Sequence, residues 1–287
     1  MSKKIIKKIF TNTGPKILFK EKENNKFKKL SNLVLKSFGK INQNKIFYVI
    51  KRTPGAGMFS NLTFVMNHLL IAHQHNFIPV VDMLNFPTIY NEKNKIDGTL
   101  NAWEYYFEPV SRYSLEEVYK SKNVLITSNK FIKEFDHKIY DIKKFNKIKK
   151  LIKVKKNILN NILLYKKKIF KNQNILGIHY RGTSYKTSAN HPMPPTKLQM
   201  HNLIHKKLKK NKFDKIFIST EDEDMYQFLK FNFKNQIIGL DSFRSKKDDA
   251  FKVYFRSKHR YLLGKEIIVE SILLSFCNQF MFVQTNV

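Results

Sequence analysis

The residues Ile175 to Pro195 read ILGIHYRGTSYKTSANHPMPP, and this stretch decides how the rest of the chain is interpreted. Its apolar start, ILGI, is typical of a short buried strand. His179 and Arg181 fall on one face of that strand, because side chains alternate between the two faces. A strand that ends in a cation and then turns at Gly182 places the charge at the carboxyl end of a sheet, where open α/β sheets bind their ligands.

The guanidinium of Arg181 has two interpretations at this stage. A planar guanidinium at a strand end suits bidentate capture of a phosphate group. The alternative is structural, with Arg181 paired to a carboxylate and His179 lying in the core. The local residues leave both open.

The composition indicates a folded and strongly basic chain. Its 287 residues suffice for one large domain or two of ordinary size, and an apolar content of 42% suffices for a buried core. The balance of 54 Lys+Arg against 22 Asp+Glu gives a formal net charge of +32. Nucleic-acid binding is one explanation, but the lysines are spread among Asn, Ile and Phe and accompany no nucleic-acid module. We favour the codon bias of an AT-rich genome, and expect attraction to nucleotide-sugars, acidic glycans or anionic membrane surfaces.

The sequence indicates a reducing compartment and no membrane span. The single cysteine, Cys277, excludes an intramolecular disulfide and lies in an apolar run typical of a buried thiol. The start, MSKKIIKKIF, lacks the apolar core of a signal peptide, and no run of apolar residues is long enough to cross a bilayer. We therefore expect a cytoplasmic protein, compatible with peripheral association on the inner face of a membrane.

The first half contains the pattern of a strand, a glycine turn, a helix and a second strand. The apolar runs at 46–50 and 78–83 predict the strands, and helical spacing follows the turn, with Ser60 as the expected helix cap. Gly55 and Gly57 allow a close approach between the backbone and a ligand at a helix amino terminus, where anions are favoured. A tight turn without a ligand explains the same glycines.

Residues 84–113 are dense in aromatic side chains and include the only tryptophan, Trp103. Rings with scattered carboxylates commonly form a wall that stacks on sugars. A satellite core beneath a long loop is the alternative. Glu104 and Glu108 would share a helical face, where one could act as a general base.

The second half predicts another parallel α/β unit. Residues 131–174 suggest one long helix or two, and Ser114 with Glu117 suggests a capping box before them. After the strand at 175, we expect a helix over 196–211 with Leu198, Leu203, Ile204 and Leu208 inward, strands at 215–220 and 236–241, and a helix at 265–276 before a strand. The acids at 221–224 suggest either a metal site or a favoured first helical turn.

Three separated blocks of the chain resemble the fucosyltransferase superfamily that includes the α1,6-, α1,2- and protein-O-fucosyltransferases and the rhizobial nodulation enzymes. The segment IHYRGTSYK is similar to its His-x-Arg-x-Thr-Asp-Lys motif, and the segment from Gly55 to Asp82 is similar to its first glycine-rich loop and following strand. The last 26 residues resemble its acid-bearing helix, Leu-Ser pair and terminal hydroxyl residues. The matching positions are His179, Arg181, Gly182 and Thr183, then Gly55, Gly57, Asn61 and Asp82, then Thr220, Glu221 and Asp222, and finally Glu270, Leu274, Ser275, Thr285 and Asn286.

The resemblance implies two Rossmann-like domains that face a cleft, the architecture called GT-B. It implies a metal-independent glycosyltransferase without a cofactor, which moves fucose from GDP-fucose to a glycan hydroxyl. Arg181 would neutralise the leaving diphosphate, His179 would contact the nucleotide, and Glu270 would recognise guanine. We expect an acceptor-side domain over 1–150 and a donor-binding domain over 151–287.

Two departures from the family pattern qualify this expectation. Ser184 stands where the family has Asp, and the chain ends at Val287 where the family continues through another helix. Two alternatives therefore stay open. One is a glycosyltransferase that uses another nucleotide-sugar, and the other is a basic nucleic-acid- or glycan-binding protein with a degenerate cleft.

Overall fold

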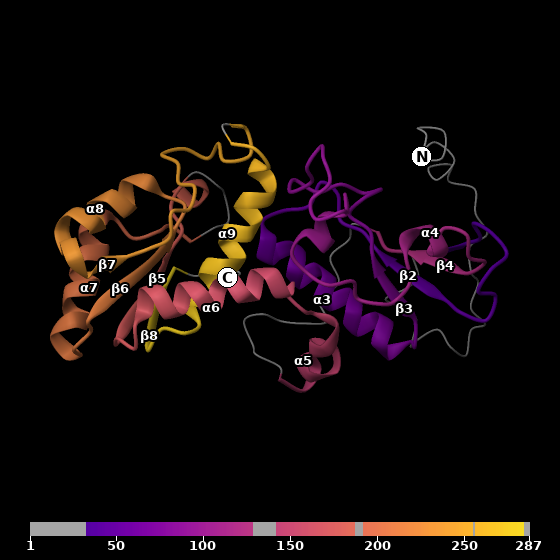
Figure 1. Cartoon of the computed structure of the whole chain (residues 1–287), viewed down its shortest axis with the longest axis horizontal. Coiled ribbons are helices and arrows are strands. Elements are labelled where there is room, and N and C mark those ends of the chain that lie inside the picture. Colours follow the sequence, from indigo (N-terminus) through magenta and orange to yellow (C-terminus); the bar gives the residue numbers. More distant parts are fainter. Residues whose placement is uncertain (1–32, 129–141, 187–191, 255, 284–287) are drawn as a thin grey trace. The chain divides into compact units, whose positions relative to one another are not determined.

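The computed structural model describes residues 33–128, 142–186, 192–254 and 256–283 (Figure 1). The predicted site residue Thr285 and the start of the predicted stiff loop, residues 190–191, lie outside these ranges. The chain divides into two compact units, unit 1 (Met1–Lys155) and unit 2 (Lys156–Val287). The elements are mixed α and β, and each unit is built around its own sheet.

The sheet of unit 1 has the strand order β1-β4-β2-β3 within the described residues. Strand β2 (Phe47–Ile50) pairs in parallel with β3 (Ile78–Val81) and with β4 (Val124–Ile126), whereas β1 (Val34–Lys36) is antiparallel to β4. Every residue of β2 is buried, because helix and loop segments cover a central parallel strand on both faces. This explains why the strand reads as a continuous apolar run.

Helix α3 (Met58–Gln74) is the crossover between β2 and β3, as the pattern predicts. The expected cap at Ser60 is wrong, since Gly57 is the N-cap and makes no side-chain cap hydrogen bond. Ser60 instead lies inside the first turn, where its hydroxyl accepts a hydrogen bond from Arg52 at 3.2 Å. The amino terminus of α3 is thus formed by the glycine loop itself.

Short elements complete unit 1. They are η3 (Ala102–Tyr105), α4 (Leu115–Val118), α5 (Ile142–Ile148) and η4 (Lys149–Leu151). Ser114 caps α4, because its side chain accepts from the backbone N–H of Glu117 at 3.1 Å, but the predicted capping box forms only in this half, since the Glu117 carboxylate accepts from Asn42 instead. Helix α5 ends at Ile148 and the next α-helix begins at Lys156, so the described part of 131–174 contains separate helices instead of a single long one.

The sheet of unit 2 is parallel throughout, in the order β7-β6-β5-β8. Its centre is formed by β5 (Ile175–Tyr180) and β6 (Lys215–Thr220), and its edges by β7 (Ile237–Ile238) and β8 (Gln279–Phe282). Strand β5 is buried at all six positions. Strand β7 is shorter than the predicted strand at 236–241, and the rest of that segment is loop.

Helices cover both faces of this sheet (Figure 1). They are α6 (Lys156–Tyr165), α7 (Lys197–Lys210), α8 (Glu223–Phe233) and α9 (His259–Leu274), with the shorter η5 (Lys166–Phe170), η6 (Ser184–Lys186) and η7 (Lys234–Gln236). None of the helices in the described ranges combines the length and the apolar character that a bilayer span requires.

The inward face of α7 agrees with the prediction at Ile204 and Leu208, which pack in the core, and differs from it at Leu198 and Leu203. Met200 and Ile204 are buried against the sheet, whereas Leu198 and Leu203 are exposed by 66% and 47%. The helix begins at Lys197 after a capping box between Thr196 and Gln199. Leu198 and Leu203 lie off the row that Met200 and Ile204 define, so their apolar character alone misled the prediction.

The two faces of β5 carry different neighbours. Ile178 and Tyr180 belong to the core that includes Met200 of α7 and Met225 of α8. Gly177 lies on the opposite face, where a Cβ atom would be 2.9 Å from the Sγ atom of Cys277 and 3.2 Å from Leu274. Helix α9 therefore approaches β5 closely at the one residue of that strand without a side chain.

This close approach predicts that Gly177→Ala destabilises unit 2. The added methyl group forces α9 away from the sheet, and such overpacking costs about 1–3 kcal/mol in the free energy of unfolding. Chemical denaturation of the purified variant measures the loss. Adding Cys277→Ala removes the sulfur atom, so the double variant should lose less stability than the sum of the single variants. Additive losses would contradict the contact.

Candidate functional site

The carboxyl end of β5 carries His179, which the sequence analysis singled out. His179 is buried and lies in register beside Ser219 of β6, on the face of the sheet that α9 covers. Burial, together with the positive charge of Arg181, lowers the pKa of His179 to about 4, so its ring is neutral at pH 7. Its Nδ1 atom has no hydrogen-bond partner among the described residues. A neutral ring with an unused nitrogen atom can accept from or donate to a ligand.

Arg181 follows β5 directly and is half-buried. Its guanidinium lies 5.1 Å from the centre of the Tyr185 ring, a cation–π contact that orients the charge. The structure thus places a cation at the carboxyl end of a central parallel strand, where the sequence predicted it.

Gly182 is required by close packing. A Cβ atom there would lie 2.3 Å from the Oδ2 atom of Asp222 and 2.6 Å from the Tyr180 ring. The turn after β5 therefore lies directly against the start of α8. Any side chain at this position would push the turn, and Arg181 with it, away from the end of β6.

The backbone of this turn donates to a carboxylate. The N–H groups of Gly182 and Thr183 reach the Oε1 atom of Glu221 at 3.0 and 3.2 Å, and the Thr183 hydroxyl reaches the same atom at 3.2 Å. Successive backbone N–H groups that converge on one point form an anion-binding site. In this structure the anion is Glu221.

Asp222 has a structural role. It caps α8, where its side chain accepts from the backbone N–H of Met225 at 2.8 Å, and it forms an ion pair of 2.6 Å with Lys186. The Thr220 hydroxyl accepts from the backbone N–H of Asp222 at 3.1 Å. Of the two interpretations of the acids at 221–224, the first-turn interpretation fits Glu223 and Asp224, which lie in the first turn of α8 behind the cap Asp222. Within the described residues, no three His, Cys, Asp or Glu side chains form a group suited to a metal ion.

Glu270 of α9 lies at the centre of a buried polar cluster on the same face of the sheet as His179. Its two oxygen atoms accept from the hydroxyls of Ser219 at 2.7 Å and Ser242 at 2.6 Å. Burial raises the pKa of Glu270 to about 7, although the two hydroxyl groups and the charge of Arg244 oppose the rise. Each oxygen keeps a lone pair for a further donor.

Sequence reasoning missed Ser242 and Arg244. Both lie in the loop after β7, in a stretch without a periodic pattern of apolar residues. The sequence around them therefore does not predict that they lie near α9. Arg244 is held with its guanidinium 3.8 Å from the centre of the Tyr226 ring, and it donates to the carbonyl oxygens of Leu240 and Ser242 at 2.8 and 3.1 Å. The segment thus brings a second cation toward the Glu270 cluster.

The glycine loop of unit 1 is fastened by Asn61. The side chain of Asn61 accepts from the backbone N–H of Ala56 at 2.9 Å and donates to the carbonyl oxygen of Ala56 at 3.0 Å. Gly55 has φ +78°, and a Cβ atom there would lie 2.9 Å from Asn61. Gly57 has open space around its Cβ position. Gly55 and Asn61 therefore have structural reasons for their identity, and Gly57 leaves room at the start of α3.

Sequence reasoning also missed Arg52 in this loop. Its guanidinium lies 4.7 Å from the centre of the Phe64 ring and bonds Ser60, so it lies along the first turns of α3. A half-buried cation near the amino terminus of a helix is repelled by the helix dipole, so other favourable contacts must offset this repulsion. Phe64 provides part of it.

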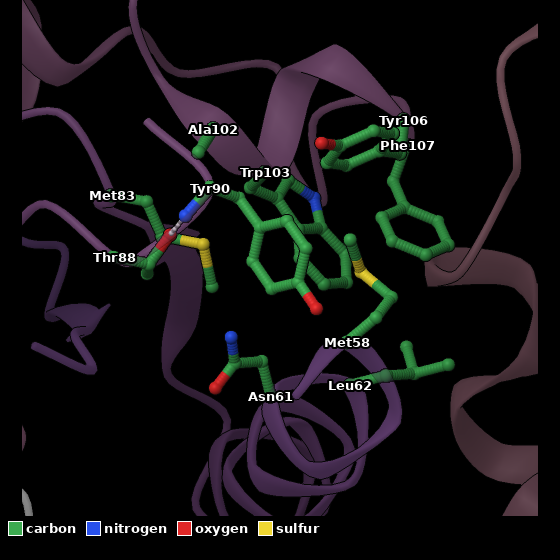
Figure 2. A pocket seen from close by; sticks show the side chains of 10 residues that line it. All are labelled: Met58, Asn61, Leu62, Met83, Thr88, Tyr90, Ala102, Trp103, Tyr106 and Phe107. Atoms are coloured by element: carbon green, nitrogen blue, oxygen red, sulfur yellow. Dashed lines mark hydrogen bonds between the residues drawn. The ribbon is translucent and has the colours of Figure 1, made fainter. Parts of the chain in front are cut away.

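The aromatic segment 84–113 forms core and a pocket. Trp103 and Phe107 stack with ring centres 4.4 Å apart, and both are buried, so the satellite-core interpretation holds for them. Figure 2 shows Met58 and Asn61 rising from the start of α3 toward Tyr90 and Trp103. The hollow between them comprises about 270 Å³, part of it open to solvent.

Glu104 is engaged in the loop beside this pocket. Its two oxygen atoms accept from Thr99 and Asn101 at 2.9 and 3.1 Å. Glu108 is exposed and lies outside the short helix that contains Glu104. The helical face that the two carboxylates were expected to share does not form.

The predicted residues thus fall into two groups, one in each unit. In unit 2, the turn after β5, with Arg181, Gly182 and Thr183, contacts the two acids that follow β6, Glu221 and Asp222. His179 and Glu270 lie together on the face of the sheet that α9 covers. In unit 1, Gly55, Gly57 and Asn61 form the loop before α3.

Comparison with known proteins identifies the fold. No protein-family model matches the chain, and no curated protein matches it in sequence. Among solved structures, it is similar to the NodZ α-1,6-fucosyltransferase co-crystallised with GDP, with a TM-score of 0.55 and 14% identity over 83% of this chain and 88% of that one. The same enzyme soaked with GDP-fucose gives 0.54 and 15%, over 83% and 88%.

A further NodZ fucosyltransferase structure, from Bradyrhizobium, has a TM-score of 0.54 and 14% identity, over 82% of this chain and 88% of that one. At such identities the likeness concerns the fold. The chain therefore has the mixed α/β fold of the NodZ fucosyltransferases, in agreement with the resemblance carried by its three sequence blocks.

Proposed function

We propose that the chain is a glycosyltransferase that transfers fucose from GDP-fucose to a hydroxyl group of a glycan. The observation that carries the proposal is the position of Arg181, a cation oriented at the carboxyl end of the central strand of unit 2. Parallel sheets bind nucleotides at this end. The fold is that of enzymes crystallised with GDP and with GDP-fucose, which supports the same donor.

The proposed reaction is a displacement at the anomeric carbon of fucose. The acceptor hydroxyl forms a bond to this carbon, the bond to the β-phosphate oxygen breaks, and GDP leaves with the bonding electrons. Negative charge grows on the diphosphate in the transition state, and a preorganised cation stabilises it most where water is excluded. The proton of the acceptor hydroxyl passes to the surrounding water. Arg181 takes the stabilising role without a metal ion in the proposed mechanism. His179, neutral and with Nδ1 unused, is the proposed contact to the nucleotide.

Unit 2 is the proposed donor-binding domain and unit 1 the proposed acceptor-side domain. Thr220 and Asp222 support the donor site by fixing the start of α8 against the turn that carries Arg181, and Glu221 accepts from the backbone of that turn when no substrate is bound. Thr285 completes the proposed donor site, and the glycine loop with Gly55, Gly57 and Asn61 is the proposed contribution of unit 1. In this proposal the acids contact the turn and do not contact the sugar.

Glu270 is the proposed guanine-recognition residue. Guanine presents two adjacent donors, and a carboxylate offers two acceptors in matching geometry. Since both oxygens already accept from serine hydroxyls, the nucleotide would use their remaining lone pairs. This role needs the ionised carboxylate, and the pKa of about 7 means that ionisation is only half complete at neutral pH.

The net charge of +32 favours a second candidate, a nucleic-acid-binding protein. Affinity for DNA that falls steeply with salt, together with no response to any nucleotide diphosphate, would select it. A response to UDP or ADP above that to GDP would select a glycosyltransferase with a different donor.

The first prediction concerns Arg181→Ala. We expect transfer from GDP-fucose to fall about 100- to 1000-fold, because one preorganised donor to the leaving group is lost. In a thermal-shift panel of GDP, UDP, ADP and CMP, the wild type should respond most to GDP, since a ligand at 100 times its dissociation constant adds about 2.7 kcal/mol. The variant should lose the GDP response while its unliganded melting temperature stays unchanged.

The matched control is Arg112→Ala, which removes the same charge from an exposed position of unit 1. This variant should keep both the GDP response and the transfer rate. Near-normal transfer by Arg181→Ala would rule out the proposed mechanism.

The second prediction uses the pKa of Glu270. The folded carboxyl holds its proton up to a pKa of about 7, whereas the unfolded one releases it near 4.5, so its contribution to stability is present below pH 4.5 and is lost as pH rises through 7. This difference corresponds to roughly 3 kcal/mol at most. Glu270→Gln removes the titration, so wild type should lose stability relative to the variant between pH 4.5 and 7.

Urea denaturation of wild type and Glu270→Gln at pH 4.5, 6 and 8 measures this gap. Glu223→Gln is the control. It is a change of the same kind at a partly exposed position whose side chain accepts a hydrogen bond from Gln227, and it should track wild type. A gap between wild type and Glu270→Gln that stays constant with pH would show that Glu270 titrates normally.

A further inference from the structure

The contact between Glu221 and the turn after β5 has the composition of a phosphate site. Three donors, two backbone N–H groups and one hydroxyl, converge on the single oxygen Oε1 of Glu221 from Gly182 and Thr183. Such a set of donors serves carboxylate and phosphate oxygens equally well. Arg181 immediately precedes these donors in the chain. This anion site at the end of β5 is therefore filled by a carboxylate of the protein itself.

The two neighbouring acids differ in how firmly they are held. Asp222 is buried, caps α8 and pairs with Lys186, so its side chain is fixed by contacts on both sides. Glu221 is only half-buried, and its side-chain hydrogen bonds within the described residues are those from the three donors of the turn. A rotation of the Glu221 side chain toward solvent therefore breaks these contacts alone.

The backbone at Glu221 does not need to move in such a rotation. Its carbonyl oxygen accepts from the N–H of Ser245 at 2.9 Å, and the N–H of Glu223 donates to the carbonyl oxygen of Ser245 at 3.1 Å. These bonds anchor the segment from both sides. The side chain of Glu221 can leave the turn while the ends of β5 and β6 stay in place.

We propose that Glu221 is an internal competitor for the diphosphate, which occupies the Gly182–Thr183 donors in the empty site and swings out when the donor substrate binds. The inference rests on the proposed function for the identity of the ligand, a nucleoside diphosphate. It makes Glu221 a specificity-determining residue. A ligand must carry enough negative charge near Arg181 to replace a carboxylate, so a diphosphate displaces Glu221 and an uncharged nucleoside does not.

The competitor role predicts that removing the charge of Glu221 tightens anion binding. Glu221→Gln keeps an oxygen that accepts from the turn, but its neutral hydrogen bonds are about half as strong as those of the carboxylate. We expect the dissociation constant for GDP, and for inorganic pyrophosphate, to fall about tenfold, which corresponds to about 1.4 kcal/mol. Isothermal titration calorimetry on the full chain measures both.

Two further variants distinguish the effect of occupying the donors of the turn from the effect of the negative charge alone. Glu223→Gln removes the same charge two residues away without touching the turn, and its affinities should stay within about twofold of wild type. Glu221→Asp keeps the charge on a side chain too short to reach the donors, and it should also bind pyrophosphate more tightly than wild type. Circular dichroism and the melting temperature establish that each variant is folded.

Each outcome bears on the inference. Weaker or unchanged pyrophosphate binding by Glu221→Gln and Glu221→Asp would make Glu221 a scaffold of the turn and overturn the competitor role, as would absence of any anion binding by Glu221→Gln. Tighter binding of pyrophosphate without any binding of GDP would sustain the competitor role and instead refute the proposed nucleotide. Guanosine without phosphate should bind wild type and Glu221→Gln alike.

Discussion

The turn that follows β5 depends on the missing side chain of Gly182. With Asp222 at 2.3 Å from where a Cβ atom would stand, the turn lies against the end of β6 as closely as a backbone can. This approach brings the backbone N–H groups of residues 182 and 183 to Glu221 and sets the direction in which Arg181 leaves the strand. The cation at the site is positioned by a contact that only glycine permits.

The other face of β5 shows a second use of a small residue. Gly177 admits α9, and α9 carries Glu270 into a region where burial opposes its charge. His179, on the same face, is neutral for the same reason. Burial on this face thus favours the neutral form of both groups. Both lie beside the carboxyl ends of the strands, where perturbed pKa values are typical of functional sites.

Much of this arrangement could be predicted from particular residues, and the remainder could not for physical reasons. Apolar runs located β2, β5 and β6, because a buried parallel strand has no polar alternation. The ends of those strands located Arg181 and the acids after Thr220. Ser242 and Arg244 gave no signal, since a loop brings them to Glu270 through tertiary packing alone. The cap of α3 was misplaced because a serine in a first turn resembles a cap in sequence.

The distribution of acids is informative in so basic a chain. The chain has 54 basic and 22 acidic residues, so its carboxylates are too few to pair with most of its lysines and arginines. Its solubility does not require carboxylates near the end of a buried strand. Yet Glu221, Asp222 and Glu270 each accept two or more hydrogen bonds at or beside the ends of β5 and β6. Two of these acids hold the turn that bears Arg181, and the third is partly protonated at neutral pH. Codon bias toward lysine accounts for the excess of positive charge over the chain, but it gives no reason for carboxylates to gather at this edge of the sheet. Their placement is expected of an anion-binding site in which acidic side chains hold the loop after β5 and the guanidinium of Arg181 faces the incoming anion.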